Sequence, residues 1–238
     1  FDYRSHGDNR QLQDAAILSL ENLLVDTLRV FTHCTTKYKH AQFIVLGHSM
    51  GGCIASRFGL IVQNKTALKK RIAGLLVLDM VETSALESLQ FMETQVSIRP
   101  RHFATIDHAI EWSIYSKYIR NINSAKISIP SQIRQEQFDA DNNGWGWRMD
   151  LKKSIEYWRE WFIGHNQAFI AIQLPKLLIL SSGNRLDKDI CGAVCQRKFR
   201  VDIMRDVGHI FHEDDPVQTA DCLRKFLRET NLLVAQTQ

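Results

Sequence analysis

A serine set between two glycines is the clearest chemical signal in this chain. Residues 47–51 read Gly-His-Ser-Met-Gly, which matches the G-x-S-x-G pattern of a nucleophile elbow. In an elbow, a sharp turn between a strand and a helix lifts the serine hydroxyl above the edge of a sheet. The pattern follows an apolar run and opens a helical stretch, as that turn requires. We therefore predict that Ser49 is a nucleophile and that the amide of Met50 donates to an oxyanion.

A serine hydroxyl needs a general base to become a nucleophile. In this architecture an acid and then a histidine follow the serine along the chain, and His209 and His212 both lie beyond the last predicted strand. His209 is the predicted base because its loop leaves the sheet at that point, and His212 is the second choice. A zinc site made of His209, His212 and Glu213 is a further alternative.

Two aspartates are candidates for the acid that orients the imidazole and stabilises the imidazolium. Asp79 ends the apolar run at 75–78, and Asp187 follows the run at 177–180. Position alone does not choose between them. In the structural alternative, Asp187 pairs with Arg185 and Lys188, or it caps the helix that follows it.

An alternation of helices and short apolar runs must position these residues. Helical spacing of apolar residues predicts a helix over 10–32 and another from Met50 to about Val62. Asp215 is the predicted cap, and Pro216 the first residue, of a final helix. Strands buried on both faces are predicted at four apolar runs, 43–46, 75–78, 177–180 and 199–204. The alternation predicts an α/β fold with a mostly parallel sheet and helices on both faces.

The middle of the chain has a different character. Residues 84–170 show no strong buried-strand run, are rich in helical patterns and hold all five tryptophans. We expect a helical cap inserted over the carboxyl edge of the sheet, with a loop at 139–144. The remaining segments, 1–83 and 171–238, then form the α/β core.

Composition narrows the function classes. Apolar residues make up 45% and charged residues 24% of the 238 residues, which predicts a globular protein and argues against disordered and fibrous classes. The net charge of +4 is spread along the chain, so we expect no nucleic-acid partner. No apolar run approaches the length of a membrane span. The five cysteines contain no Cys-x-x-Cys pair, which favours reduced thiols and a cytoplasmic or nuclear location.

Several further segments, taken together with the elbow, resemble the protein phosphatase methylesterases from residue 1 to about 230. The most discriminating segments are Leu-Asp-Met-Val-Glu at 78–82, Glu-Trp-Ser at 111–113 and Arg-Leu-Asp-Lys-Asp at 185–189. The segment Gly-His-Ile-Phe-His-Glu-Asp at 208–214 is also similar, although its Gly-His pair is generic. The resemblance implies an α/β-hydrolase fold. It also implies removal of the methyl ester from the C-terminal leucine of the type 2A phosphatase catalytic subunit. It favours Asp79 as the acid and keeps Asp187 as the alternative.

The resemblance also sets further expectations and leaves rivals open. The Gly-rich loop that supplies a second oxyanion donor in that family, and the first strands of its sheet, are expected to lie before Phe1, so the sheet here is expected to lack them. The ester chemistry requires no metal or organic cofactor. One rival is a small-molecule serine esterase or lipase of the same fold. The other is a module that binds and inhibits the phosphatase without turning over its ester.

Overall fold

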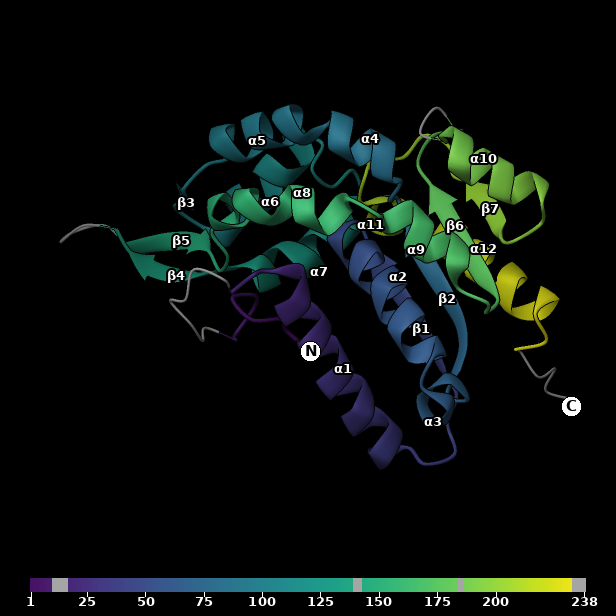
Figure 1. Ribbon diagram of the computed structural model, residues 1–238. Helices are drawn as coiled ribbons and strands as arrows, with labels where there is room; N and C mark the ends of the chain where they lie inside the picture. Colours follow the sequence, from purple (N-terminus) through teal and green to yellow (C-terminus); the bar gives the residue numbers. More distant parts are fainter. Residues whose placement is uncertain (10–16, 139–142, 184–185, 233–238) are drawn as a thin grey trace, which may run out of the picture.

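A computed structural model describes residues 1–9, 17–138, 143–183 and 186–232. Its centre is a parallel sheet of four strands in the order β1-β2-β6-β7 (Figure 1). The strands are β1 (Phe43–His48), β2 (Ile72–Leu78), β6 (Lys176–Leu180) and β7 (Arg200–Ile203). The first three strands cover their predicted apolar runs, and β7 lies within the predicted run at 199–204, so the predicted parallel sheet is confirmed.

Both faces of this sheet are covered, as its apolar strands require. Successive side chains of a strand point to opposite faces. In β2, Leu75 and Val77 pack into one apolar cluster, whereas Leu76 and Leu78 pack into another. The first cluster includes side chains from α2 (Met50–Gln63), α8 (Ile155–Phe162), α9 (His165–Ala171) and α10 (Lys188–Cys195). The second cluster includes Phe226 of α12 (Pro216–Glu229). The predicted arrangement of helices on both faces is therefore confirmed (Figure 1).

The helices around the sheet begin and end close to the predicted positions. The elbow helix begins at Met50 as predicted and ends at Gln63. The predicted helix over 10–32 is observed from Leu20 to Lys37, and residues 10–16 lie outside the described part of the chain. The helices of this core are α1 (Leu20–Lys37), α2 (Met50–Gln63), α3 (Thr66–Lys69), α8 (Ile155–Phe162), α9 (His165–Ala171), α10 (Lys188–Cys195), α11 (Phe211–Asp214) and α12 (Pro216–Glu229).

The last helix has the predicted cap. The Asp215 carboxylate accepts a hydrogen bond from the Gln218 amide at 2.8 Å, and Pro216 is the first helical residue. Proline is favoured there because its missing N–H has no partner inside a helix anyway. The short α11 directly before it follows the loop that contains His209.

The segment between β2 and β6 is mostly helical, as predicted, but it also holds a small antiparallel sheet that sequence analysis did not predict. That sheet has the order β3-β5-β4. Its strands are β3 (His102–Phe103), β4 (Ile133–Gln137) and β5 (Asn143–Trp147). Besides α8 and α9, this segment contains α4 (Glu82–Glu87), α5 (Leu89–Ile98), α6 (Ile106–Tyr115), α7 (Ile122–Gln132) and the 3-10 turn η1 (Leu151–Ser154). Of the predicted loop at 139–144, residues 139–142 are outside the described part and 143–144 begin β5.

Two further features concern membrane-spanning helices and the state of the cysteines. Across the described ranges, none of the helices has both the length and the apolarity needed to cross a lipid bilayer. All five cysteines have free thiols; Cys53 is buried, and Cys191 and Cys195 are exposed.

Candidate active site

Ser49 adopts the strained backbone of a nucleophile elbow. It lies between β1 and α2 with φ +52° and ψ −119°, a conformation that L-residues rarely adopt. Its amide donates to the carbonyl of Leu78, which ends the neighbouring strand β2, at 2.9 Å. The serine is therefore held above the carboxyl end of the sheet, where ligands bind in open α/β folds.

Glycines make this tight turn possible. A Cβ on Gly47 would collide with the backbone carbonyl of Gly51 in the first turn of α2, so residue 47 has room for hydrogen only. A Cβ on Gly52 would lie only 3.0 Å from the Val77 side chain. Glycine at this position therefore allows α2 to pack close to β2. The amide of Met50, the first residue of α2, has no acceptor within the helix. It is therefore available to an oxyanion at the elbow.

The imidazole of His209 is bonded to Asp79. Its Nδ1 lies 2.7 Å from Oδ2 of Asp79, whose residue is only 1% exposed. A neutral imidazole that donates from Nδ1 keeps its Nε2 lone pair free to accept a proton. The two residues come from loops after β7 and β2, so chain segments 130 residues apart meet at one sheet edge.

Asp79 is held in place by a residue that sequence analysis did not single out. The backbone amide of Ser181 donates to Oδ1 of Asp79 at 2.8 Å, and the Ser181 hydroxyl bonds the same carboxylate at 2.9 and 3.0 Å. Ser181 directly follows β6, the strand next to β2, and that neighbouring position is the signal that points to it. Asp79 itself has φ +50°, so both Ser49 and Asp79 hold left-handed backbones.

His48 joins the elbow to the histidine loop. Its Nε2 lies 2.8 Å from the backbone carbonyl of His209, and its ring centroid lies 4.6 Å from that of His209 and 4.7 Å from that of His212. Burial, followed by the nearby His209 and His212, lowers the pKa of His48 to about 3. His48 is therefore neutral near pH 7, and its Nε2–H must donate because a carbonyl only accepts.

These contacts show that Ser49 and His209 lie close together. Ser49 is the neighbour of His48, which bonds the His209 backbone, and it also bonds the strand end that precedes Asp79. Among the described residues, the Ser49 hydroxyl makes no hydrogen bond with the imidazole. Such bonds are often long in unliganded enzymes and tighten when substrate binds.

Asp187, the alternative acid, is engaged elsewhere. Its Oδ1 accepts from the Ile190 amide at 3.0 Å and so caps α10. Its Oδ2 accepts from the Thr83 hydroxyl at 2.8 Å and from the Asn166 side-chain amide at 2.6 Å. The carboxylate therefore ties three segments together, and the predicted capping role is observed. Its predicted partner Arg185 lies outside the described residues.

The histidines after β7 differ in their surroundings. His212 packs against His48, its Nδ1 is buried without a partner, and burial lowers its pKa. Burial also raises the pKa of Glu213. Within the described ranges, no three His, Cys, Asp or Glu side chains gather as metal ligands would, so the alternative zinc group of His209, His212 and Glu213 is not formed.

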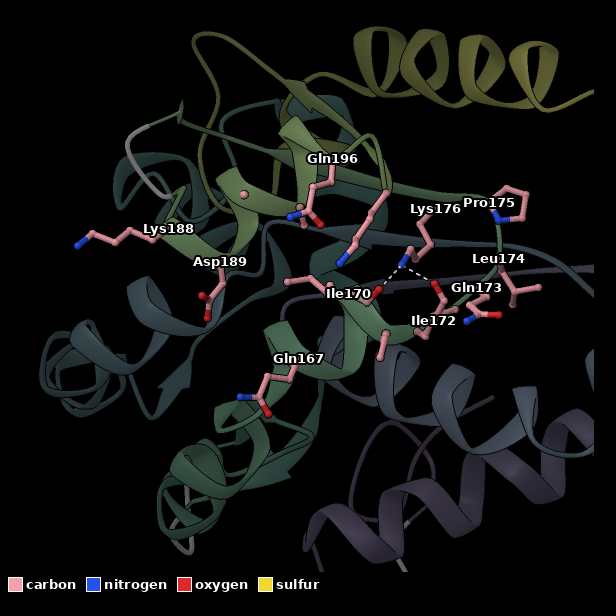
Figure 2. Close-up of a pocket in the computed structure, with 14 residues that line it drawn as sticks. Gln167, Ile170, Ile172, Gln173, Leu174, Pro175, Lys176, Lys188, Asp189 and Gln196 are labelled. Atoms are coloured by element: carbon pink, nitrogen blue, oxygen red, sulfur yellow. Dashed lines mark hydrogen bonds between the residues drawn. The ribbon is translucent and has the colours of Figure 1, made fainter.

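A cavity of about 950 Å³ lies between α9, the start of β6 and α10 (Figure 2). None of the candidate catalytic residues lines it. The buried Lys176 donates from Nζ to the carbonyl of Phe169 at 2.7 Å. It also donates to the carbonyls of Ile170 and Ile172, at 3.0 and 2.5 Å (Figure 2). Burial, followed by nearby Lys198, lowers the pKa of Lys176 to about 8. Lys176 therefore caps the C-terminal end of α9, and these three bonds use all three N–H groups of its ammonium.

Comparison with known sequences supports the resemblance noted above. The chain is 34% identical over 225 residues to a probable protein phosphatase methylesterase 1 of Caenorhabditis elegans, which is 94% of this chain and 59% of the relative. It is 34% identical over 241 residues to protein phosphatase methylesterase 1 of Schizosaccharomyces pombe, which is 98% of this chain and 66% of the relative. The chain thus spans between half and two thirds of the length of such relatives.

Solved structures and a family model agree on the fold. E-2-(acetamidomethylene)succinate hydrolase aligns with a TM-score of 0.71 at 16% identity, over 94% of this chain and 78% of that one. An esterase of Mycobacterium tuberculosis aligns with a TM-score of 0.65 at 19% identity, over 94% and 74%. The model of the alpha/beta hydrolase family matches residues 1–222. Sheet order, helix placement and family model together confirm the predicted fold, and the chain belongs to the alpha/beta hydrolase family.

Proposed function

We propose that this chain carries the catalytic centre of a serine carboxylesterase that removes the C-terminal leucine methyl ester from the catalytic subunit of protein phosphatase 2A. The observation that carries the proposal is the 2.7 Å contact of His209 with Asp79 beside the strained elbow at Ser49. A serine, an imidazole and a carboxylate in this arrangement form the general template for acyl transfer.

In the proposed reaction, Ser49 attacks the ester carbonyl while Nε2 of His209 takes the hydroxyl proton. Asp79 accepts from Nδ1 and stabilises the imidazolium that forms. The amide of Met50 donates to the oxyanion of the tetrahedral intermediate. The bond from the carbonyl carbon to the methoxy oxygen then breaks, His209 protonates that oxygen so that methanol leaves, and the acyl group stays on Ser49 as an acyl-enzyme. Water, deprotonated by the same imidazole, attacks the acyl-enzyme and frees the carboxylate and the serine.

The proposed mechanism includes a second oxyanion donor besides the amide of Met50. One such donor contributes about 2.7–4 kcal/mol to transition-state stabilisation in other enzymes. Because the chain spans between half and two thirds of the length of its relatives, activity should be measured on the full-length protein. The free thiols are consistent with the cytoplasmic or nuclear location that we propose.

The phosphatase substrate is supported by the relatives, which are named as protein phosphatase methylesterases. The rival small-molecule esterase shares the same serine chemistry and differs only in what it binds. Turnover of methylated phosphatase, compared with turnover of short acyl esters, separates the two. A clear preference for the short esters would refute the proposed substrate.

A serine-directed probe tests the chemistry itself. A fluorophosphonate should label the wild-type protein and leave Ser49→Ala unlabelled, because the probe forms its bond with the activated hydroxyl. Cys53→Ser is a control for labelling at another nucleophile and should be labelled as wild type. Equal labelling of wild type and Ser49→Ala would refute the esterase mechanism. A Ser49→Ala protein that still binds phosphatase would show that binding and catalysis are separable.

A further inference from the structure

Arg99 is a partly buried arginine that stacks on an aromatic side chain. It follows α5, in the turn that leads to β3. The centre of its guanidinium lies 3.2 Å from the centroid of the Trp147 ring and 5.5 Å from that of Tyr118. Burial lowers its pKa, although a guanidinium keeps its charge in proteins. A fixed positive charge therefore sits within the middle segment of the chain.

The surface beneath this charge is rigid. The indole N–H of Trp147 donates to the carbonyl of Pro100 at 2.7 Å. The Trp147 ring also meets the rings of Phe103 and Trp112, with centroids 5.4 and 5.6 Å away. An indole held by a hydrogen bond and by two ring contacts presents one fixed face to the guanidinium.

The N–H groups of Arg99 are unused. Among the described residues its guanidinium makes no hydrogen bond and no ion pair, and Nε is fully buried without a partner. Stacking on Trp147 occupies one face of the guanidinium, whereas the N–H groups point outward in its plane. A buried donor without a partner is unfavourable, and a charged one more so. These unused donors indicate a ligand that accepts hydrogen bonds.

Two cavities adjoin at this arginine. One has a volume of about 320 Å³ and the other about 370 Å³, and both are lined by Arg99, Trp147, Met149 and Leu151. The carboxylates that line them have other donors. Asp2 accepts from the Asp8 amide, Glu136 pairs with Arg134, and Asp150 accepts from the Lys152 amide. No carboxylate of the described residues therefore neutralises Arg99.

We propose that Arg99, stacked on Trp147, is a binding subsite for a carboxylate, supplied by an acidic side chain of the protein whose ester is hydrolysed. The proposal rests on the proposed function for the source of that carboxylate. A planar carboxylate matches the in-plane fork of a single guanidinium in a bidentate pair. The apolar walls formed by Met149 and Leu151 suit the methylene groups of an acidic side chain.

Direct binding is tested without any esterase activity. The full-length protein, labelled with ¹⁵N-arginine, is titrated with propionate while the Nε–Hε signals are followed by NMR. We expect the Arg99 signal to shift to saturation. The exposed Arg228 of α12, which lines neither cavity, should shift only in proportion to concentration. Arg99→Lys and Arg99→Met should both lose the saturable response while the other arginine signals keep their positions. No saturable shift at Arg99, or saturation with neutral propionamide, would overturn the subsite.

Inorganic phosphate distinguishes the kind of anion. Saturation by phosphate and not by propionate would overturn the assignment to a carboxylate. Saturation by propionate at lower concentrations than phosphate supports it.

The source of the carboxylate is tested with peptides that end in leucine methyl ester. A neutral peptide series carries one glutamate, moved one position at a time, with glutamine as the matched control. We expect one position at which glutamate lowers KM about tenfold relative to glutamine with kcat unchanged, the range of a charge-assisted hydrogen bond. Arg99→Met should abolish that glutamate preference, and Arg228→Met should retain it. Hydrolysis without any glutamate preference would overturn the substrate assignment. If no peptide is hydrolysed, the proposed function fails, and the NMR titration still decides the subsite.

Discussion

Asp79 and Asp187 follow neighbouring strands of one sheet, yet they bond to different parts of the molecule. Asp79 comes directly after β2, has φ +50° and bonds the imidazole of His209. Asp187 lies farther beyond β6, has an extended backbone and caps α10. Both positions satisfy the rule that functional groups gather at the carboxyl ends of parallel strands. The difference shows that the geometry directly after the strand decides which carboxylate reaches the imidazole.

The largest expected effect separates the two carboxylates in catalysis. Asp79→Asn should lower kcat about 10⁴-fold, because the amide favours the wrong imidazole tautomer. Asp187→Asn should change kcat by less than about threefold, because it lies outside the hydrogen bonds of His209. The measurement is steady-state hydrolysis of methylated phosphatase by the full-length protein. A comparable loss of kcat in Asp187→Asn would contradict the different roles of the two carboxylates.

The second prediction concerns stability, for which we expect Asp187 to be important. Asp187→Ala should lower the free energy of unfolding by about 2 kcal/mol, because it removes a helix cap and leaves the donors Thr83 and Asn166 without their acceptor. Urea unfolding at pH 7 measures this change. The exposed neighbour Asp189, changed to Ala, should cost no more than about 0.5 kcal/mol. Equal losses in the two variants would contradict the structural role of Asp187.

The third prediction concerns how Asp79 is held. Ser181→Ala removes the hydroxyl that bonds the carboxylate and leaves the backbone amide bond in place. We expect kcat to fall about tenfold, the effect of one charge-assisted hydrogen bond. Ser97→Ala, at an exposed position of α5, is the control. An unchanged kcat in Ser181→Ala would show that the backbone amide alone orients Asp79.

The smallest expected effect is a pH dependence of stability at α9. Burial, followed by nearby Arg57, lowers the pKa of His165 to about 3, and its neighbours also include Asp187 and the backbone of Met80. Because the unfolded chain binds the proton first, this histidine contributes stability above pH 6.5 that is lost as the pH falls towards 3. Between pH 7 and 5.5 the loss should be about 1 kcal/mol. His165→Gln should reduce the loss by that amount, and an unchanged pH dependence would contradict the buried neutral state.

Local signals allowed much of the fold to be predicted. The parallel strands were predictable because strands buried on both faces are apolar throughout, and the elbow because its glycines are required by short contacts within five residues. The small antiparallel sheet was not predicted. Its strands read Ile-Arg-Gln-Glu-Gln and Asn-Gly-Trp-Gly-Trp, which are polar or glycine-rich and lack a buried-strand pattern.

The candidate site was less predictable because its contacts join distant segments. The strand ends pointed to both Asp79 and Asp187, and only the fold shows which one meets His209. Ser181 was missed because its partner lies 102 residues away in the chain. The bond from His48 to the His209 backbone depends on the path of a loop, which no local pattern reports.

The central claim is that Asp79, and not Asp187, accepts the Nδ1 proton of His209. An imidazole proton that is hydrogen-bonded to a carboxylate gives a signal far downfield in the proton NMR spectrum. We predict a low-field signal in the wild-type protein that persists in Asp187→Asn and disappears in Asp79→Asn and His209→Gln. A signal that survives Asp79→Asn and is lost in Asp187→Asn would contradict the account.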